Sequence, residues 1–359
     1  MISDSVYFYT DAVTPEGIFS LCKICSEDTS STRTFLVRGS LNERFSFVEN
    51  VCTSLEKEGI FSQKFLNVFD LQKLDGVYFP DIDVYLFSSD FPLTMPDVRQ
   101  YTIDLGIAAN KKELFLNKEL IREAQEREKK YIKKSAKFLL TARSVMEDNA
   151  RLAGDCVNAE KIERFVSRFV KREFGTASSF SGKEYFRFLT AVTPSGCSFP
   201  ESTLTNMCPK LYCIDDKLGF TSSLLMSQLR ESALICGFDV INMLSPLGRQ
   251  KSAEHIFVPE LGLGIITSNV IHTYKGDCFK RINALRFIDN EKIKKHKERI
   301  RFNLSAQKEL ISQSYHLMSE AKKSRDEYSQ ICSRSYDKEK IQSLEKETVK
   351  EILSYFSCT

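Results

Sequence analysis

Residues 12–17 read AVTPEG, and residues 191–196 read AVTPSG. A second pair of similar segments follows in the same order, VYFPDIDVYLFSSD at 77–90 and IFVPELGLGIITSN at 256–269. The two hexapeptides start 179 residues apart, and the same spacing separates Pro80 from Pro259. Two matches with one spacing rarely arise by chance, so the sequence indicates two copies of a single unit.

Within each copy, short apolar runs alternate with helical patterns. Thr14 and Thr193 each precede a proline, as helix N-caps commonly do, so we expect a helix to begin at each T-P-x-G. The later helices are expected to end at glycines, Gly59 and Gly237. These helices are predicted at 46–58 and 223–236, and the strands at 34–37, 64–69, 84–87, 211–214, 238–243 and 263–266. This alternation predicts an α/β fold with parallel sheets wrapped by helices.

Each α/β segment is followed by a long charged region, at 116–152 and at 293–331, whose apolar residues repeat with the period of a helix. Shorter helices are expected at 159–173 and 337–356, so each copy is predicted to end in an antiparallel helical hairpin. The predicted domains are 1–174, with an α/β region at 1–115 and a hairpin at 116–174, and 183–359, with an α/β region at 183–288 and a hairpin at 289–359. The small, polar stretch GTASSFSG at 175–182 is the expected linker.

The composition is that of a globular protein, since 42% of the 359 residues are hydrophobic and 28% are charged. The net charge is only +3, and the basic residues at 127–137 alternate with glutamates, which favours a solvated helix face over a nucleic-acid-binding patch. No apolar run reaches the roughly 18 residues of a membrane span, and the amino-terminal segment lacks the pattern of a signal peptide. We therefore expect a cytoplasmic protein with no membrane or nucleic-acid partner.

Cysteine and histidine do not form a metal-binding pattern. The eleven cysteines are scattered, as expected for reduced thiols, and the four histidines are dispersed. Cys22 and Cys25 form a C-x-x-C pair, but without a second pair or a nearby histidine we interpret them as partly buried residues of a helix. No metal site is predicted.

The repeated segments also carry a family resemblance. The matching segments are AVTPEG (12–17), DGVYFP (75–80) and DLG (104–106) in the first copy, and AVTPSG (191–196), HIFVPEL (255–261) and TSNVIH (267–272) in the second. Together they are similar to a family of uncharacterised bacterial tandem P-loop ATPases, over nearly the whole chain. The resemblance implies two P-loop NTPase-like units, each a three-layer α/β/α structure with a parallel sheet. The alternative is a likeness of fold only, from a generic βαβ unit.

Both phosphate-binding loops depart from the working pattern G-x-x-x-x-G-K-[ST], whose glycines and lysine hold the phosphates and whose hydroxyl holds Mg²⁺. The first octet, GSLNERFS at 39–46, has Arg44 at the second glycine and Phe45 at the lysine. The second octet, DKLGFTSS at 216–223, has Asp216 at the first glycine and Ser222 at the lysine. The candidate nucleotide-binding residues of the two degenerate loops are Gly39, Ser40, Arg44, Ser46, Lys217, Gly219, Ser222 and Ser223.

The carboxylate that would hold the metal-bound water is also missing from its expected place. That place falls at Ser88 in the first copy, with Asp90 two residues later, and at Thr267 in the second. Phosphoryl transfer needs the lysine, the Mg²⁺ ligands and a water-positioning group together, so no catalytic residue is assigned and no cofactor is expected. The resemblance then implies a degenerate (pseudo) P-loop NTPase that acts as a non-catalytic scaffold or regulator. By analogy with other degenerate paralogues, its expected partner is an intact relative.

Two other functions stay open. Arg38 or Arg44 in the first loop, and Lys217 in the second, could supply the missing positive charge and make the protein an unconventional ATP-binding protein or ATPase that uses ATP and Mg²⁺. An arginine fork or a displaced lysine reproduces the P-loop lysine poorly, which disfavours this alternative. The charged helical hairpins could instead bind nucleic acid, which would show as a steep salt dependence of binding.

Overall fold

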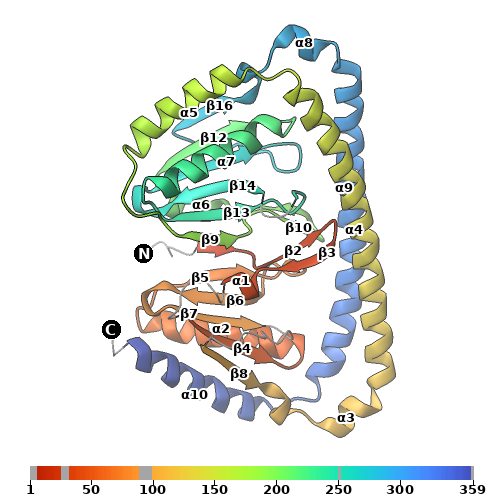
Figure 1. The fold of residues 1–359 in the computed structure, drawn as a ribbon. Coiled ribbons are helices and arrows are strands. Elements are labelled where there is room, and N and C mark those ends of the chain that lie inside the picture. Colours follow the sequence, from red (N-terminus) through yellow and green to blue (C-terminus); the bar gives the residue numbers. More distant parts are fainter. Residues whose placement is uncertain (1–5, 26–31, 89–98, 250–251, 357–359) are drawn as a thin grey trace. The chain divides into compact units, whose positions relative to one another are not determined.

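The computed structural model describes residues 6–25, 32–88, 99–249 and 252–356, and these residues form two compact units (Figure 1). Unit 1 takes its described residues from the segments Met1–Ala12, Ile18–Lys134 and His316–Thr359, and unit 2 takes its own from Val13–Gly17 and Ser135–Tyr315. The predicted boundaries 1–174 and 183–359 follow the repeats of the sequence, whereas each compact unit combines residues from both repeats.

The elements of the first repeat are β1 (Val6–Phe8), β2 (Asp11–Thr14), β3 (Gly17–Ser20), α1 (Cys22–Cys25), β4 (Arg33–Arg38), α2 (Leu41–Lys57), β5 (Gln63–Leu66), β6 (Leu74–Phe79), η1 (Pro80–Ile82), β7 (Val84–Ser88), β8 (Arg99–Asp104), η2 (Leu105–Ala108), α3 (Lys111–Leu116), α4 (Lys118–Gly154) and α5 (Ala159–Glu173). Those of the second are β9 (Glu184–Arg187), β10 (Ala191–Thr193), β11 (Gly196–Ser198), α6 (Glu201–Met207), β12 (Lys210–Asp215), α7 (Phe220–Ile235), β13 (Val240–Leu244), β14 (Ala253–Val258), η3 (Pro259–Leu261), β15 (Leu263–Ser268), β16 (Lys280–Asn283), η4 (Ala284–Phe287), α8 (Asn290–Lys294), α9 (Lys297–Ser333) and α10 (Lys338–Phe356).

Each unit contains a six-stranded sheet, and the two sheets have the same strand order. The order is β1-β5-β6-β7-β4-β8 in unit 1 and β9-β13-β14-β15-β12-β16 in unit 2. Even an irregularity is shared, because the register shifts between Phe65 and Leu66 in one sheet and between Met243 and Leu244 in the other. The α/β class and the duplication predicted from the sequence are therefore confirmed.

The expectation of wholly parallel sheets is corrected by one strand in each unit. β6 is antiparallel to both β5 and β7, and β14 is antiparallel to both β13 and β15. The other neighbouring strands in each sheet pair in parallel. The antiparallel strand arises because the link to the next strand is one short 3₁₀ turn, η1 or η3, which reverses the chain without a crossover helix.

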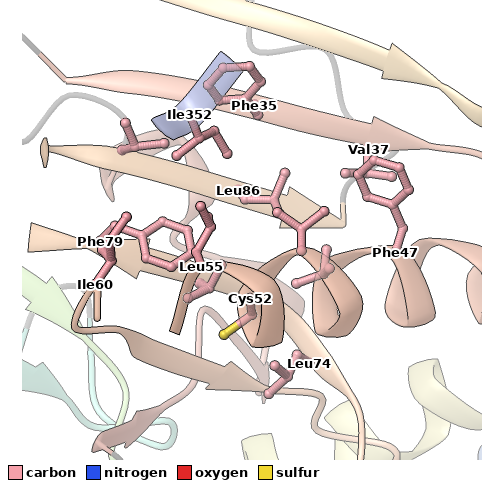
Figure 2. Close-up of a cluster of buried hydrophobic side chains, with 14 of the residues drawn as sticks. Phe35, Val37, Phe47, Cys52, Leu55, Ile60, Leu74, Phe79, Leu86 and Ile352 are labelled. Atoms are coloured by element: carbon pink, nitrogen blue, oxygen red, sulfur yellow. The ribbon is translucent and has the colours of Figure 1, made fainter. Parts of the chain in front are cut away.

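The core of each unit lies between the sheet and two helices. In unit 1, α2 packs against β6 and β7, and α10 packs against α2, so that Ile352 of α10 lies beside Phe35 of β4 (Figure 2). In unit 2, α7 covers β13 and β14, and α5 packs against α7 through Ile162 and Phe169. The short helix at the end of each repeat thus belongs to the core of the other repeat's sheet.

The two T-P-x-G segments are tight turns, so the prediction that helices begin there is wrong. Thr193 and Gly196 pair across the antiparallel strands β10 and β11, and the Thr193 hydroxyl donates to the Gly196 carbonyl (2.7 Å). The Thr14 hydroxyl donates to the Gly17 carbonyl in the same way (2.9 Å). Both glycines have positive φ angles, 115° at Gly17 and 122° at Gly196, which fits the end of a turn with proline at its second position.

The two 37-residue helices α4 and α9 pair with each other in antiparallel fashion, and not each with the shorter helix that follows it. Within unit 2, Asp148 of α4 accepts hydrogen bonds from Arg299 and Asn303 of α9, and the Ser135 and Ser314 hydroxyls lie 2.6 Å apart. Within unit 1, Arg127 of α4 forms an ion pair with Glu327 of α9 (2.6 Å). The predicted hairpins within each repeat are corrected accordingly, because α5 and α10 bury their apolar residues against sheets instead.

Candidate functional site

Unit 2 contains a cavity of about 610 Å³ beside the predicted phosphate-binding loop of the second copy. Its wall comes from the connection between β12 and α7, the loop after β13, the ends of β14 and β15, and one side each of α4 and α9. All four second-copy candidates line it, namely Lys217, Gly219, Ser222 and Ser223. The structure therefore brings the second-copy candidates together around one hollow.

Asp216 lies at the turn that leads into α7 and accepts the backbone N–H groups of that turn. Its carboxylate accepts hydrogen bonds from the backbone N–H groups of Leu218 (2.9 Å), Gly219 (3.0 Å) and Ser222 (2.8 Å). The side chain is buried, and it places a negative charge at the amino terminus of α7, where the helix dipole stabilises an anion. The chain thus supplies its own anion to the N–H groups that would otherwise be offered to a ligand.

The other second-copy candidates do not have the arrangement expected of a working phosphate-binding loop. Lys217 is exposed, and Ser223 is exposed on the first turn of α7. Gly219 has a φ of 82°, so the backbone turns there through the left-handed region that glycine tolerates best. The Ser222 hydroxyl donates to the Gly219 carbonyl at 3.5 Å, which closes the turn.

In the first copy the predicted octet does not form a loop. Only Gly39 and Ser40 separate β4 from α2, so the helix begins at Leu41, five residues before the predicted start. The backbone N–H of Ser40 donates to the Tyr336 hydroxyl (3.0 Å), and a Cβ on Gly39 would lie 2.9 Å from that of Leu105. Ser46 is exposed on α2, and Arg44 is buried. The four first-copy candidates therefore do not surround one ligand.

Ser88 of β7 and Thr267 of β15 hold the places where a metal-binding carboxylate would be expected, and only Thr267 lines the cavity. Ser88 ends β7 next to Val37 of β4, and Asp90 lies outside the described residues. Thr267 lies in β15 and lines the cavity, where its backbone N–H donates to His255 Nδ1 (3.0 Å) and its hydroxyl donates to the Glu254 carbonyl (2.9 Å). Thr267 is therefore fixed by hydrogen bonds within its own sheet.

A buried group of charged residues in unit 1 was missed by the sequence analysis. Glu128 of α4 accepts hydrogen bonds from Arg325 (2.6 Å) and Tyr328 (2.8 Å) of α9. The Arg325 guanidinium lies over the Phe69 ring, 3.7 Å from its centroid. Burial raises the pKa of Asp75 to about 8 and neighbouring Asp11 adds to this, while Asn67 and the charges of Arg325 and Arg44 oppose it. Arg44, a candidate loop residue in the sequence, thus belongs to a buried ionic group.

The carboxyl group that faces the cavity of unit 2 is Glu254 of β14. Burial raises the pKa of this residue to about 7, while the neighbouring polar side chains of Asn269 and Thr190 act to lower it. Asn269 Nδ2 donates to Glu254 Oε1 (3.0 Å). His255 Nε2 lies 3.7 Å from Glu254 Oε2, but burial and the charge of His272 hold the pKa of His255 well below its usual value, so this imidazole is neutral. Glu254 therefore has no cationic partner among these neighbours.

Within the described residues, no group of three or more histidine, cysteine, aspartate or glutamate side chains is arranged to hold a metal ion. The helices of the same described ranges include none that is long and apolar enough to cross a membrane. In comparisons with known proteins, no family model, curated protein or solved structure matches the chain.

Proposed function

We propose that this protein is a degenerate relative of the P-loop NTPases that does not hydrolyse nucleotide and acts as a scaffold or regulator. The observation that carries the proposal is the Asp216 carboxylate, which accepts the N–H groups of Leu218, Gly219 and Ser222. A triphosphate at this helix terminus would have to displace a buried carboxylate and face its charge. Electrostatic repulsion and the lost hydrogen bonds both oppose nucleotide binding there.

The first copy supports the same proposal in a different way. Its strand-to-helix connection has two residues, Gly39 and Ser40, and the N–H of Ser40 is bonded to Tyr336. Backbone N–H groups that curl around a phosphate need a longer, glycine-rich loop. Neither copy has a lysine at the place where positive charge stabilises the transferred phosphoryl group. An intact relative in the same cell is the proposed partner of such a protein.

Equilibrium dialysis of the full chain with labelled ATP and GTP, with and without Mg²⁺, tests the proposal together with a phosphate-release assay. We expect neither Mg²⁺-dependent binding nor hydrolysis above the rate of the buffer. The variant Asp216→Gly, which removes the internal anion, is expected to gain weak nucleotide binding without turnover. Turnover by the unmodified protein that collapses in Lys217→Ala but not in an exposed control, Lys295→Ala, would establish the unconventional ATPase instead.

A basic hollow in unit 2 favours nucleic-acid binding as a second candidate function. The hollow measures about 530 Å³ between α5 and the segment 280–287, and its lining residues are Lys161, Arg164, Phe165, Arg168, Phe169, Arg172, Lys280, Arg286 and Phe287. Six of these nine residues are cationic, and none is acidic. α10 is the helix of unit 1 that corresponds to α5, and its residues Glu347 and Glu351 occupy the positions of Arg168 and Arg172. The cluster of cationic side chains is therefore a feature of unit 2 and is not shared by the equivalent helix of unit 1. Such a surface suits phosphate groups of a polyanion.

Fluorescence anisotropy with labelled single- and double-stranded oligonucleotides over a salt series tests this second function. Each phosphate contact that is lost lowers the slope of log affinity against log salt by about 0.9 for duplex DNA. We expect Arg164→Ala with Arg168→Ala to lower both the affinity and this slope. The matched pair Lys346→Ala with Lys350→Ala on α10 should leave them unchanged, and equal effects of the two pairs would reject a site at the hollow.

A further inference from the structure

The cavity of unit 2 and the buried ionic group of unit 1 occupy equivalent positions of the two repeats. The helices α4 and α9 both span 37 residues and start 179 residues apart, at Lys118 and Lys297. A shift of 179 residues relates the two helices. In the second unit it places Met146 of α4 at the position of Arg325 and Asn149 of α4 at that of Tyr328. It places Gln307 of α9 at the position of Glu128. All three line the cavity. One ancestral site therefore has two present forms, one filled with the chain's own charges and one hollow.

The acidic residue of this site is kept in both units, whereas its basic neighbours are kept in one. Asp75 and Glu254 both stand second in equivalent strands, β6 and β14. Arg44 and Ser222 both stand fifteen residues before the glycine that ends their helix, Gly59 or Gly237. Unit 2 thus has Ser222 and Met146 at the places where unit 1 has its two buried arginines. A buried carboxyl has been retained without the guanidinium groups that accompany it in the other copy.

The charges around the cavity are otherwise matched within the chain. Arg143 forms an ion pair with Glu16 (2.6 Å), and Arg249 forms one with Glu147 (2.6 Å). The Asp216 carboxylate is occupied by backbone N–H groups, and Lys217 is exposed to solvent. Of the two buried acidic residues of the lining, Asp216 is held by three backbone N–H groups, whereas Glu254 has neither such a set of N–H donors nor an arginine or lysine partner in the described residues.

Three polar atoms of the lining have no hydrogen-bond partner in the described structure: Glu254 Oε2, Ser252 Oγ and Asn149 Nδ2. Each is buried, and a buried polar atom without a partner costs free energy that a ligand can recover. Two of the three atoms, the carboxyl oxygen and the hydroxyl oxygen, can accept hydrogen bonds. Met146, Leu247 and Phe220 add apolar surface to the same wall.

We propose that the cavity of unit 2 binds a small organic molecule with a guanidinium group, which pairs with Glu254 in the place that Arg325 and Arg44 take in unit 1. A guanidinium is planar and presents five N–H donors when it carries one substituent, so it can meet a carboxylate with two parallel hydrogen bonds. Its alkyl chain then contacts Met146 and the other apolar residues of the wall. Asn149 remains available to donate to a polar group elsewhere on the ligand.

Isothermal titration calorimetry with two matched probes tests the proposal on the full chain at pH 8, where Glu254 is largely ionised. The probes are n-butylguanidinium chloride and n-butylurea, which have nearly the same shape but differ in charge. We expect the guanidinium probe to bind at least tenfold more tightly than the urea. Glu254→Gln should weaken the guanidinium probe at least tenfold, and Glu231→Gln, the same change at an exposed position of α7, should leave it unchanged.

A second variant copies the filled site of unit 1 into unit 2. Met146→Arg is expected to abolish binding of the guanidinium probe, with an unfolding temperature no lower than that of the parent protein, because the new side chain would occupy the cavity and pair with Glu254. Equal affinity for the two probes, undiminished binding by Glu254→Gln, or no heat with the guanidinium probe at millimolar concentration would each overturn the proposal. The nucleotide assays above are independent of these outcomes, since they report on the α7 terminus and Asp216.

Discussion

Asp75 and Glu254 are equivalent buried carboxyl groups with different surroundings. Asp75 lies near the charges of Arg44 and Arg325, and burial still raises its pKa to about 8. Glu254 has the polar side chains of Asn269 and Thr190 as neighbours in place of cations, and burial raises its pKa to about 7. The sequence could not reveal either environment, because Arg325 and Arg44 lie far apart in the chain and meet only through packing. Arg44 was therefore interpreted as a loop residue.

The raised pKa of Glu254 makes its contribution to stability depend on pH. The folded protein holds this proton more tightly than the unfolded chain, so the contribution is complete below pH 4.5 and is lost as the pH rises through about 7. Glu254→Gln cannot lose a proton, and we expect it to gain up to about 3 kcal/mol relative to the parent between pH 5 and pH 8. Urea unfolding at several pH values measures this difference, and a constant difference would contradict it.

Breaking the buried ionic group of unit 1 should destabilise the protein strongly. Arg325→Met leaves the Glu128 charge buried without its cation, which commonly costs about 3–5 kcal/mol. Adding Glu128→Gln copies the residues of unit 2 and should recover some of this loss. The exposed pair Arg127–Glu327 is the control, and Arg127→Met there should cost less than about 1 kcal/mol. Denaturant unfolding of the parent, the two single variants and the double variant completes a double-mutant cycle, in which strict additivity would contradict the coupling of Arg325 and Glu128.

At the scale of elements, the sequence predicted the six longest helices and the strands β4, β5, β7, β12, β13 and β15, but it did not predict the other strands of the two sheets and misread the T-P-x-G turns. Threonine followed by proline occurs both at helix starts and in tight turns, so these two residues alone do not decide between them. The deciding residue is the glycine, whose positive φ at Gly17 and Gly196 belongs to the hairpin. The sequence did not reveal that the chain reverses direction after β6 and β14, because the 3₁₀ turns η1 and η3 that follow these strands are only three residues long.

Helix α7 should depend on Asp216 as its cap. Asp216→Ala removes three hydrogen bonds and the favourable charge at the helix terminus, and we expect a loss of about 1–3 kcal/mol. Asp216→Asn keeps one acceptor oxygen and should lose less. Thermal unfolding with circular dichroism compares the two variants, and Asp215→Ala at the end of β12 is the neighbouring control. An Asp216→Ala protein as stable as its parent would show that the carboxylate does not hold the loop.

At the scale of the whole molecule, each sheet depends on a helix from the other repeat. Ile352 of α10 is fully buried in the core of unit 1 (Figure 2). Phe169 of α5 is buried in the core of unit 2. The sequence predicted both helices, but it could not show which sheet each would cover, since either sheet offers an apolar face of similar composition.

A chain that ends at Tyr336 tests this dependence because it lacks all of α10. We expect the described strands of unit 1 to lose hydrogen-exchange protection, since the core around Phe35 and Leu55 would face water. The strands of unit 2 should keep theirs, because no residue of that unit is removed. A chain that lacks only residues 357–359 is the control. Full protection of β4 and β7 in the shortened chain would contradict the role of α10.

The exchange of terminal helices has a consequence for the history of the chain. A half-length ancestor with this plan could have completed its core only with the helix of a second molecule, as in a domain-swapped homodimer. Joining two such genes would have turned that obligatory partnership into a single polypeptide. From then on, selection would no longer have had to keep the two ligand sites identical. One site could close upon its own arginines while its twin stayed open, which an ancestral dimer of identical chains could not achieve.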